Sequence, residues 1–133
     1  MKFDHAAFQV SDIDKSIEFY VEKLGFKLCF KDTDLKEKEV FAFLEIGDAR
    51  IELLQDLAGK YDIPPVRKPY CPHFALEVQD MGKAVEMLKK NKINIIRGPL
   101  EIKGEETWIY FSDPDNNVLE FIQWYHKKEQ DNY

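Results

Sequence analysis

The chain has 133 residues, of which 25 are acidic and 19 basic, giving a net charge of −6. Hydrophobic residues make up 44%, which is enough apolar material for one packed domain or two small modules that share a core. The basic residues are mostly lysines scattered among Asp and Glu, so no concentrated basic face is expected. This composition argues against partners such as nucleic acid or anionic membranes.

The N-terminus and the cysteines indicate the compartment. The first residues contain no apolar signal core, and no apolar run is long enough to span a bilayer, so we predict a cytoplasmic protein. With only Cys29 and Cys71, a disulfide scaffold is not indicated. Cys29 lies in an apolar run and is predicted to be a small core residue. Cys71 lies two residues before His73, but its neighbourhood lacks partners for a metal role.

The elements follow one another in a regular order. Residues 3–10 are predicted to form a strand, after which Asp12 can cap a helix that ends at Gly25. Apolar residues at helical spacing from Met81 to Leu88 predict a second helix, after a strand at 73–79. Turn signals at Gly47-Asp48 and 113–117 separate further apolar runs. Three strands follow each helix, at 26–31, 39–46 and 50–56, and then at 93–97, 106–112 and 118–124.

The sequence repeats itself. When it is shifted by 68 residues, the two halves match without a gap, at more positions than chance would give. The matched pairs include His5 with His73, Ala7 with Ala75, Val10 with Val78, Asp12 with Asp80, Lys15 with Lys83, Glu18 with Glu86, Phe43 with Phe111, Glu52 with Glu120, and Gln55 with Gln123. The halves are therefore duplicates, and each half reads as βαβββ.

These observations predict an α+β fold of two tandem βαβββ modules whose curved sheets form a metal-binding cleft. We expect a single domain over 1–124, made of module 1 (1–57) and module 2 (70–124). The linker 58–69 contains prolines, which disfavour a helix or a central strand. A polar, frayed tail follows at 125–133, in which His126 is expected to be solvated.

Four side chains are candidate metal ligands: His5, Glu52, His73 and Glu120. The alternation of each strand places the His on the face opposite the apolar set that would lie under the helix. Each Glu stands alone among apolar residues, which is costly unless a cation meets it. The same interval of 47 residues separates His from Glu in both halves. The alternative is that duplication copied a structural His–Glu contact. Mixed N and O ligands favour Ni, Co, Zn, Mn or Fe(II) over Mg or Ca.

These residues resemble the vicinal oxygen chelate (glyoxalase/bleomycin resistance/dioxygenase) superfamily, and within it glyoxalase I. The resemblance covers about residues 3–124. Besides the strand that opens with His5, it rests on the segments Ser16-Ile17-Glu18-Phe19-Tyr20, Leu24-Gly25-Phe26, Arg50-Ile51-Glu52-Leu53, Pro72-His73-Phe74-Ala75, Asp113-Pro114-Asp115-Asn116 and Leu119-Glu120-Phe121.

The resemblance implies a metal-dependent lyase or isomerase, with Ni, Zn or Co as the divalent ion. It would convert the hemithioacetal of a 2-oxoaldehyde and a thiol, through an enediolate, into a 2-hydroxyacyl thioester. Glu120 would be the catalytic base, and Glu52 its counterpart for the other face.

The resemblance also names substrate-binding candidates. Gln9 stands where the family often has an Arg that holds glutathione, while Arg97 and Lys103 resemble the family's substrate-side loop. Modules of this kind pair within a chain or across chains, so we expect a homodimer, with the site at the subunit interface if the modules swap.

Three other functions remain open. Another metalloenzyme of the superfamily, such as a CoA-thioester epimerase or a thiol transferase, would keep the metal, although the family's epimerases typically carry Gln at the position of Glu52. A non-catalytic binding protein would typically lack the four ligands. A metal-free structural relic would be unaffected by replacing Glu120 with Gln.

Overall fold

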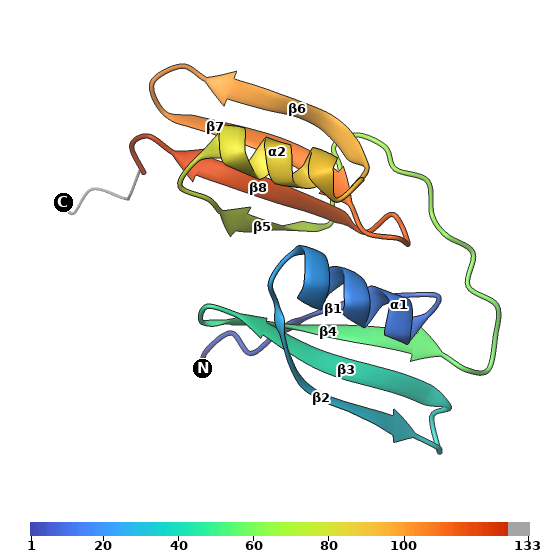
Figure 1. The fold of residues 1–133 in the computed structure, drawn as a ribbon. Helices are drawn as coiled ribbons and strands as arrows, with labels where there is room; N and C mark the ends of the chain where they lie inside the picture. The colour runs from blue at the N-terminus through green and yellow to red at the C-terminus, as the bar shows by residue number, and fades with distance from the viewer. Residues whose placement is uncertain (128–133) are drawn as a thin grey trace. The chain divides into compact units, whose positions relative to one another are not determined.

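The computed structural model describes residues 1–127, which divide into two units (Figure 1). The first unit comprises Met1–Pro65 with Pro114–Asn116, and the second comprises Val66–Asp113 with the described chain from Asn117 onward. Each unit has the order βαβββ and contains one four-stranded mixed sheet. The predicted α+β class and the two tandem βαβββ repeats are therefore confirmed.

The first unit has the sheet order β1-β4-β3-β2. Strand β1 runs parallel to β4, with Ala7 opposite Glu52, and the other pairs are antiparallel. The α-helix continues directly into a short π-helical turn. The elements are β1 (Ala6–Gln9), α1 (Ile13–Glu18), η1 (Phe19–Lys23), β2 (Lys27–Asp34), β3 (Glu39–Ile46) and β4 (Ala49–Asp56).

The second unit repeats this plan with the order β5-β8-β7-β6. Strand β5 is parallel to β8, with Ala75 opposite Glu120. Residues 57–72, which precede this unit's first strand, contain no helix or strand. The elements are β5 (His73–Glu77), α2 (Met81–Lys90), β6 (Ile95–Ile102), β7 (Glu106–Ser112) and β8 (Val118–Trp124).

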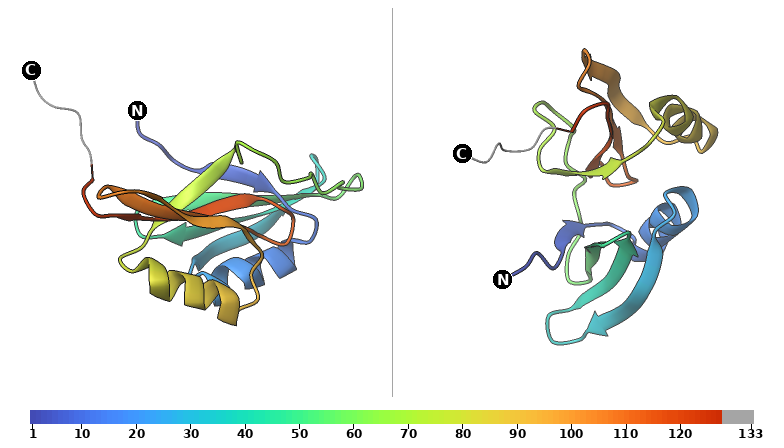
Figure 2. Two further views of the ribbon diagram at one scale, coloured as in Figure 1. Left: turned by 90° about the horizontal axis from the view of Figure 1, so that it is seen from above. Right: turned by 90° about the vertical axis from the view of Figure 1, so that its left-hand side faces the viewer.

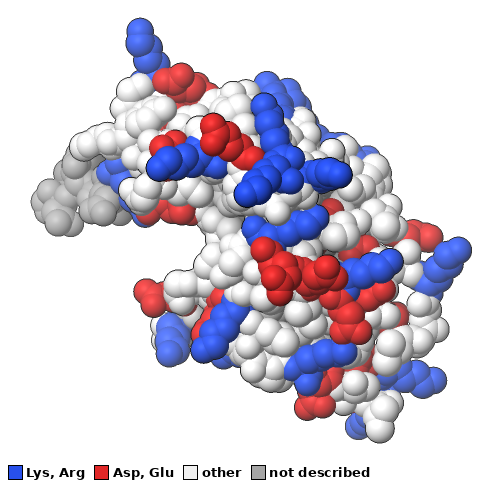
Figure 3. Space-filling view, viewed as in Figure 1, with Lys and Arg blue, Asp and Glu red and all other residues white. Residues whose placement is uncertain are grey.

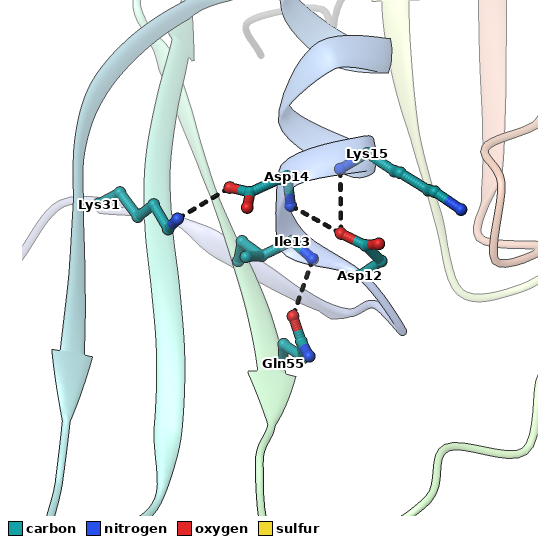
Figure 4. A network of polar contacts seen from close by, with 6 residues as sticks. All are labelled: Asp12, Ile13, Asp14, Lys15, Lys31 and Gln55. Atoms are coloured by element: carbon teal, nitrogen blue, oxygen red, sulfur yellow. Dashed lines mark hydrogen bonds and ion pairs between the residues drawn. The ribbon is translucent and has the colours of Figure 1, made fainter.

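Both helices begin in the same way. Asp12 accepts hydrogen bonds from the backbone N–H groups of Asp14 and Lys15, so its predicted role as N-cap is confirmed, and Asp80 accepts one from Lys83 at the start of α2. The backbone N–H of Ile13 donates to Oε1 of Gln55 at 2.9 Å (Figure 4). Its counterpart in the second unit joins Met81 to Gln123 at 2.8 Å. The matched glutamines therefore fix each helix to the last strand of its own sheet.

One face of each sheet packs under the helix of its unit (Figure 2). On that face of the first sheet, Ala42, Leu44, Ile51 and Leu53 are buried. The corresponding face of the second sheet is also buried, at Ile109, Phe111, Leu119 and Phe121. Because side chains alternate along a strand, Glu52 and Glu120 project from the opposite faces.

The repeat contains a one-residue shift that the gapless alignment missed. Phe43 lies opposite Glu52, whereas Phe111 lies opposite Leu119 and is fully buried. The residue that occupies the position of Phe43 in the second unit is Tyr110, which lies opposite Glu120. The match of Phe43 with Phe111 was therefore wrong, because Tyr110 and Glu120 are ten residues apart in the chain, whereas Phe43 and Glu52 are nine apart.

Several predicted elements differ at their ends. The first strand is shorter than 3–10, so His5 directly precedes it, whereas β2 and β6 extend further than predicted. Cys29 is exposed and does not belong to the core. It lies at a register irregularity between Leu28 and Phe30, on the edge strand β2, where residues Lys27 to Thr33 are all exposed.

Charged side chains of both signs are mixed over the surface visible in Figure 3. In residues 1–127 no helix has the length and apolar character needed to cross a membrane. Of the predicted tail, His126 is exposed and its backbone N–H donates to the carbonyl of Glu105 at 3.2 Å. Residues 128–133 lie outside the described part of the chain.

Candidate metal site

The first unit brings His5 and Glu52 together. His5 comes two residues before Ala7, the register partner of Glu52, so both side chains lie on the face away from α1. Nε2 of His5 is 3.6 Å from Oε1 of Glu52. The other ring nitrogen, Nδ1, lies 2.7 Å from Oδ2 of Asp4, and the ring edge meets Phe43 with centroids 4.8 Å apart.

The second unit brings His73 and Glu120 together in the same way. Nε2 of His73 is 2.9 Å from Oε1 of Glu120. Nδ1 lies 2.9 Å from the carbonyl oxygen of Tyr70, and the ring meets Tyr110 edge-on at 5.5 Å. Each unit therefore holds one His–Glu pair at the equivalent place on its sheet.

Burial changes the acidity of Glu120. Desolvation raises the pKa of this carboxyl above 4.5, although the nearby His73 opposes the shift, and the negative charge of Glu106 adds to it. A raised pKa makes the carboxylate a better proton acceptor. Exposed Asp4 shows the opposite effect, because its hydrogen bond with His5 and the charge of Arg50 lower its pKa.

The hydrogen bonds fix which nitrogen of His73 can meet a cation. A backbone carbonyl oxygen can only accept a hydrogen bond, so Nδ1 of His73 carries a proton and donates it to Tyr70. In the neutral imidazole this leaves a lone pair on Nε2, which faces an oxygen of Glu120 at 2.9 Å. Two such acceptors require a proton or a metal ion between them, and N and O donors of this kind suit a divalent transition metal.

Each unit supplies two of the four predicted ligands. Within residues 1–127, neither unit contains three or more His, Cys, Asp or Glu side chains grouped so that they could hold a metal ion. Cys71 does not complete the second pair, because its sulfur lies 3.8 Å from Nδ1 of His73 and not beside Nε2. The donor types suit a metal ion, but one unit alone does not provide a full ligand set.

A groove of about 450 Å³ lies in the second unit. Tyr110 and Tyr70 line it and also contact His73 through the ring and the carbonyl oxygen, so the groove adjoins the His73–Glu120 pair. Sequence reasoning found Arg97 but missed the aromatic walls. The period-two alternation of β7 places Trp108 and Tyr110 on one face and is the signal that could have found them. The lining residues are Lys68, Pro69, Tyr70, Arg97, Leu100, Glu101, Trp108 and Tyr110.

The predicted substrate-side loop is largely a strand. Arg97 lies within β6, and the register of β6 shifts on both sides of it. Gly98 makes this possible, because a Cβ there would come within 3.0 Å of the carbonyl oxygen of Trp108. Lys103 is exposed in the turn after β6 and does not line the groove.

Gln9 lies in a different place from Arg97. It is exposed at the end of β1, in a hollow of about 300 Å³ in the first unit that Glu39 and Asp56 also line. Two carboxylates beside it make this hollow unfavourable for an anionic group.

The fold and the twin His–Glu pairs define a class of duplicated βαβββ proteins, and comparison with known families identifies it. The model of the Glyoxalase/Bleomycin resistance protein/Dioxygenase superfamily matches residues 2–121. The chain belongs to this superfamily, as its sequence resemblance predicted.

Within this superfamily, the chain is similar to curated proteins named lactoylglutathione lyase. A lactoylglutathione lyase of Arabidopsis thaliana is 35% identical over 124 residues, which are 92% of this chain but 44% of that protein. The chain therefore spans less than half the length of this plant relative. A probable lactoylglutathione lyase of Vibrio cholerae is 32% identical over 121 residues, which cover 90% of this chain and 88% of that protein.

Solved structures show the same fold. Glyoxalase I from Zea mays has a TM-score of 0.74 and 33% identity, over 90% of this chain and 43% of that one. The trypanothione-dependent glyoxalase I of Leishmania major also has a TM-score of 0.74, with 25% identity, over 92% of this chain and 86% of that one.

Proposed function

We propose that the protein is a metal-dependent isomerase of the glyoxalase I type. It converts the hemithioacetal of a 2-oxoaldehyde and a thiol into a 2-hydroxyacyl thioester. The observation that supports this most is the repeated contact between His Nε2 and a Glu carboxylate, at the same place on both sheets. The relatives named lactoylglutathione lyase support the same reaction.

We infer that His5, Glu52, His73 and Glu120 together hold one divalent ion, with Ni, Zn or Co as the expected metals. Two neutral imidazoles and two carboxylates balance a charge of +2. When bound, the ion would polarise the two adjacent oxygens of the substrate and so make the neighbouring C–H more acidic. The hydrogen bonds at both Nδ1 atoms support this, because they leave each Nε2 free to bind a metal.

The chain's own carboxylates move the proton. Glu120 removes the hydrogen from the hemithioacetal carbon, and the electron pair forms a double bond to the adjacent carbon. The π electrons of the carbonyl group on that adjacent carbon move onto its oxygen, which takes up the hydroxyl proton of the hemithioacetal. The proton held by the carboxylate then returns to the adjacent carbon, so that the aldehyde carbon becomes the thioester carbonyl and no atom is gained or lost. The raised pKa of Glu120 supports its role as the base. Glu52 serves the opposite face of the substrate.

We also propose how the substrate is held. Arg97 and the aromatic groove beside His73 take part of the substrate, because they adjoin the catalytic pair and combine apolar walls with a cation. Neither Gln9 nor Lys103 lines this groove, and both remain weaker proposals for the same role.

The ligand set needs one module of each kind. Module 1 (1–57) and module 2 (70–124), joined by the linker 58–69, provide these in one chain or in two chains of a homodimer. Sedimentation analysis would test the homodimer, with one protomer per particle as the contrary result.

The reaction is tested by elemental analysis of the purified protein, followed by assays after loading with Ni or Zn. Methylglyoxal is supplied with glutathione or with another small thiol, and thioester formation is followed. We expect about one metal ion per four-ligand site and turnover that chelation abolishes. Metal uptake without thioester formation from any thiol would reject the glyoxalase reaction while leaving the metal site in place.

A further inference from the structure

Arg50 is a cation beside the first ligand pair that the proposed reaction has not used. It lies on β4 two residues before Glu52, so the two side chains leave the sheet on the same face. Its guanidinium lies 4.7 Å from the centre of the Phe43 ring. The same ring touches His5, so Phe43 connects Arg50 with the proposed metal ligand.

The carboxylates around Arg50 have closer partners elsewhere. Asp4 lies 2.7 Å from His5. Glu45, the register partner of Arg50, lies 3.9 Å from Lys27. Within residues 1–127, the Nε atom of Arg50 is buried and has no hydrogen-bond partner. A buried N–H without an acceptor is unfavourable, so a ligand oxygen at this point would stabilise it.

The fold does not require a cation at this position. In the second unit the corresponding residue is Val118, which is buried and lies opposite His73. In the first unit Ala6 lies opposite Ile51 in a parallel pair of strands. The residues that precede them, His5 and Arg50, are therefore neighbours, as His73 and Val118 are in the second unit. The same place on two similar sheets thus holds an apolar side chain in one unit and a guanidinium in the other. Arg50 is therefore a specific feature of the first site.

We propose that Arg50 binds a carboxylate of the substrate, next to the His5–Glu52 pair, and so selects hemithioacetals that bear an acidic group. A guanidinium and a carboxylate form two parallel hydrogen bonds, and stacking on Phe43 keeps the planar group oriented. The carboxylate comes from the thiol or from the aldehyde. The inference rests on the proposed function and adds the substrate class to it.

Kinetics with paired substrates test this selection. Arg50→Gln and Arg50→Val, the second of which installs the residue of the other unit, are compared with Arg50→Lys and with the control Lys15→Gln. Lys15 is exposed on α1, and its replacement changes the net charge equally. For the thiol, methylglyoxal is assayed with glutathione and with glutathione diethyl ester. For the aldehyde, 4,5-dioxopentanoate and methylglyoxal are each assayed with 2-mercaptoethanol.

We expect Arg50→Gln and Arg50→Val to lower kcat/KM by about 10- to 100-fold for the acidic member of one pair. The neutral member of that pair should change little, Arg50→Lys should recover part of the loss, and Lys15→Gln should behave as wild type. The pair that responds identifies which part of the substrate carries the carboxylate. Equal changes for the acidic and neutral members of both pairs would overturn the proposal.

A binding measurement separates this inference from the reaction itself. The chain has only three arginines, so the Nε–H signal of Arg50 in a ¹⁵N–¹H spectrum can be assigned with Arg50→Lys. Glutathione or 4,5-dioxopentanoate, whichever carries the recognised carboxylate, should shift this signal in a saturable way, whereas glutathione diethyl ester and methylglyoxal should not. If wild type shows that shift but no turnover, the reaction is wrong and the role of Arg50 stands. If turnover is present but Arg50 responds to neither acidic substrate, Arg50 only packs against Phe43.

Discussion

The two units share one fold plan but hold their ligand pairs in different surroundings. In the first, His5 and Glu52 are 3.6 Å apart, with 32% and 17% of their side chains exposed. In the second, His73 and Glu120 are 2.9 Å apart, with 21% and 10% exposed. The first pair is oriented by an exposed aspartate, and the second by a backbone carbonyl. The two units therefore share the donor types, while the second pair is less exposed to solvent and closer together.

The largest expected effect is a difference in kcat between variants of the two carboxylates, Glu120 and Glu52. Glu120→Gln should lower kcat by about 10³-fold, because it removes the base whose pKa burial has raised. Glu52→Gln should cost only about 10-fold, since Gln keeps an oxygen ligand and Glu52 serves the other face. Measured kcat values, corrected for the metal content of each variant, would check this. Equal losses in both variants would mean that the two units share the chemistry evenly.

A second experiment asks whether the two pairs must come from one chain. The variants His5→Gln/Glu52→Gln and His73→Gln/Glu120→Gln should each be inactive. If a site takes one pair from each of two chains, mixing the variants by unfolding and refolding should restore about a quarter of wild-type activity, because half of the dimers then contain one intact site. If activity stays absent although mixed dimers form, each site is built within one chain.

A smaller effect on metal affinity is expected from Asp4, which orients His5. Asp4→Asn should weaken metal binding about 10-fold, because it replaces the anion that holds Nδ1 of His5. Competition with a chelator would measure this affinity. Asp14→Asn is the control, since Asp14 pairs with Lys31 on the helix side of the same unit. An equal loss of metal affinity in both variants would mean that Asp4 acts only through the net charge of the protein and not through its contact with His5.

Much of the fold was accessible from local patterns. Apolar runs between turn signals located every strand, with differences at the ends, and Asp12 marked the start of the first helix. The repeat of Gln55 at Gln123 was visible in the sequence, although only the structure explains it as a contact to the helix start. These features were predictable because each depends on neighbours along the chain or on one strand partner.

What sequence reasoning missed depends on register. The longer turn before β8 places Tyr110 where Phe43 stands in the first unit, a shift that the gapless alignment hid. Strand β6 continues past Arg97 to Ile102, so most of the expected substrate-side loop is strand, and Arg97 lines the groove. The exposure of Cys29 follows from the edge position of β2, which an apolar run does not reveal. The structure shows both His–Glu contacts, and binding of a metal ion by these residues stays a prediction.

The smallest expected effect is on the stability of the folded protein. It concerns the more buried pair, His73 and Glu120, and requires no assay of turnover. In the metal-free protein, the pKa of Glu120 is raised above 4.5 in the folded state, so the folded chain binds the proton more tightly than the unfolded chain. The stability that this group contributes is present below 4.5 and is lost as the pH rises through the raised pKa. Glu120→Gln resembles the protonated form at every pH. It should therefore unfold at a higher temperature than wild type at neutral pH, with the difference vanishing in acid.

The control for this effect is Glu77→Gln, which removes one charge from an exposed position of the same unit and should leave the unfolding temperature almost unchanged. Adding the metal should reverse the order, since an ionised Glu120 binds a cation better than an amide does, and ligand binding stabilises the folded state. Unfolding temperatures with and without metal, measured from acid to neutral pH, would show both effects. If Glu120→Gln is less stable than wild type at neutral pH without metal, burial of this carboxylate is not costly, and its proposed activation as a base loses its physical reason.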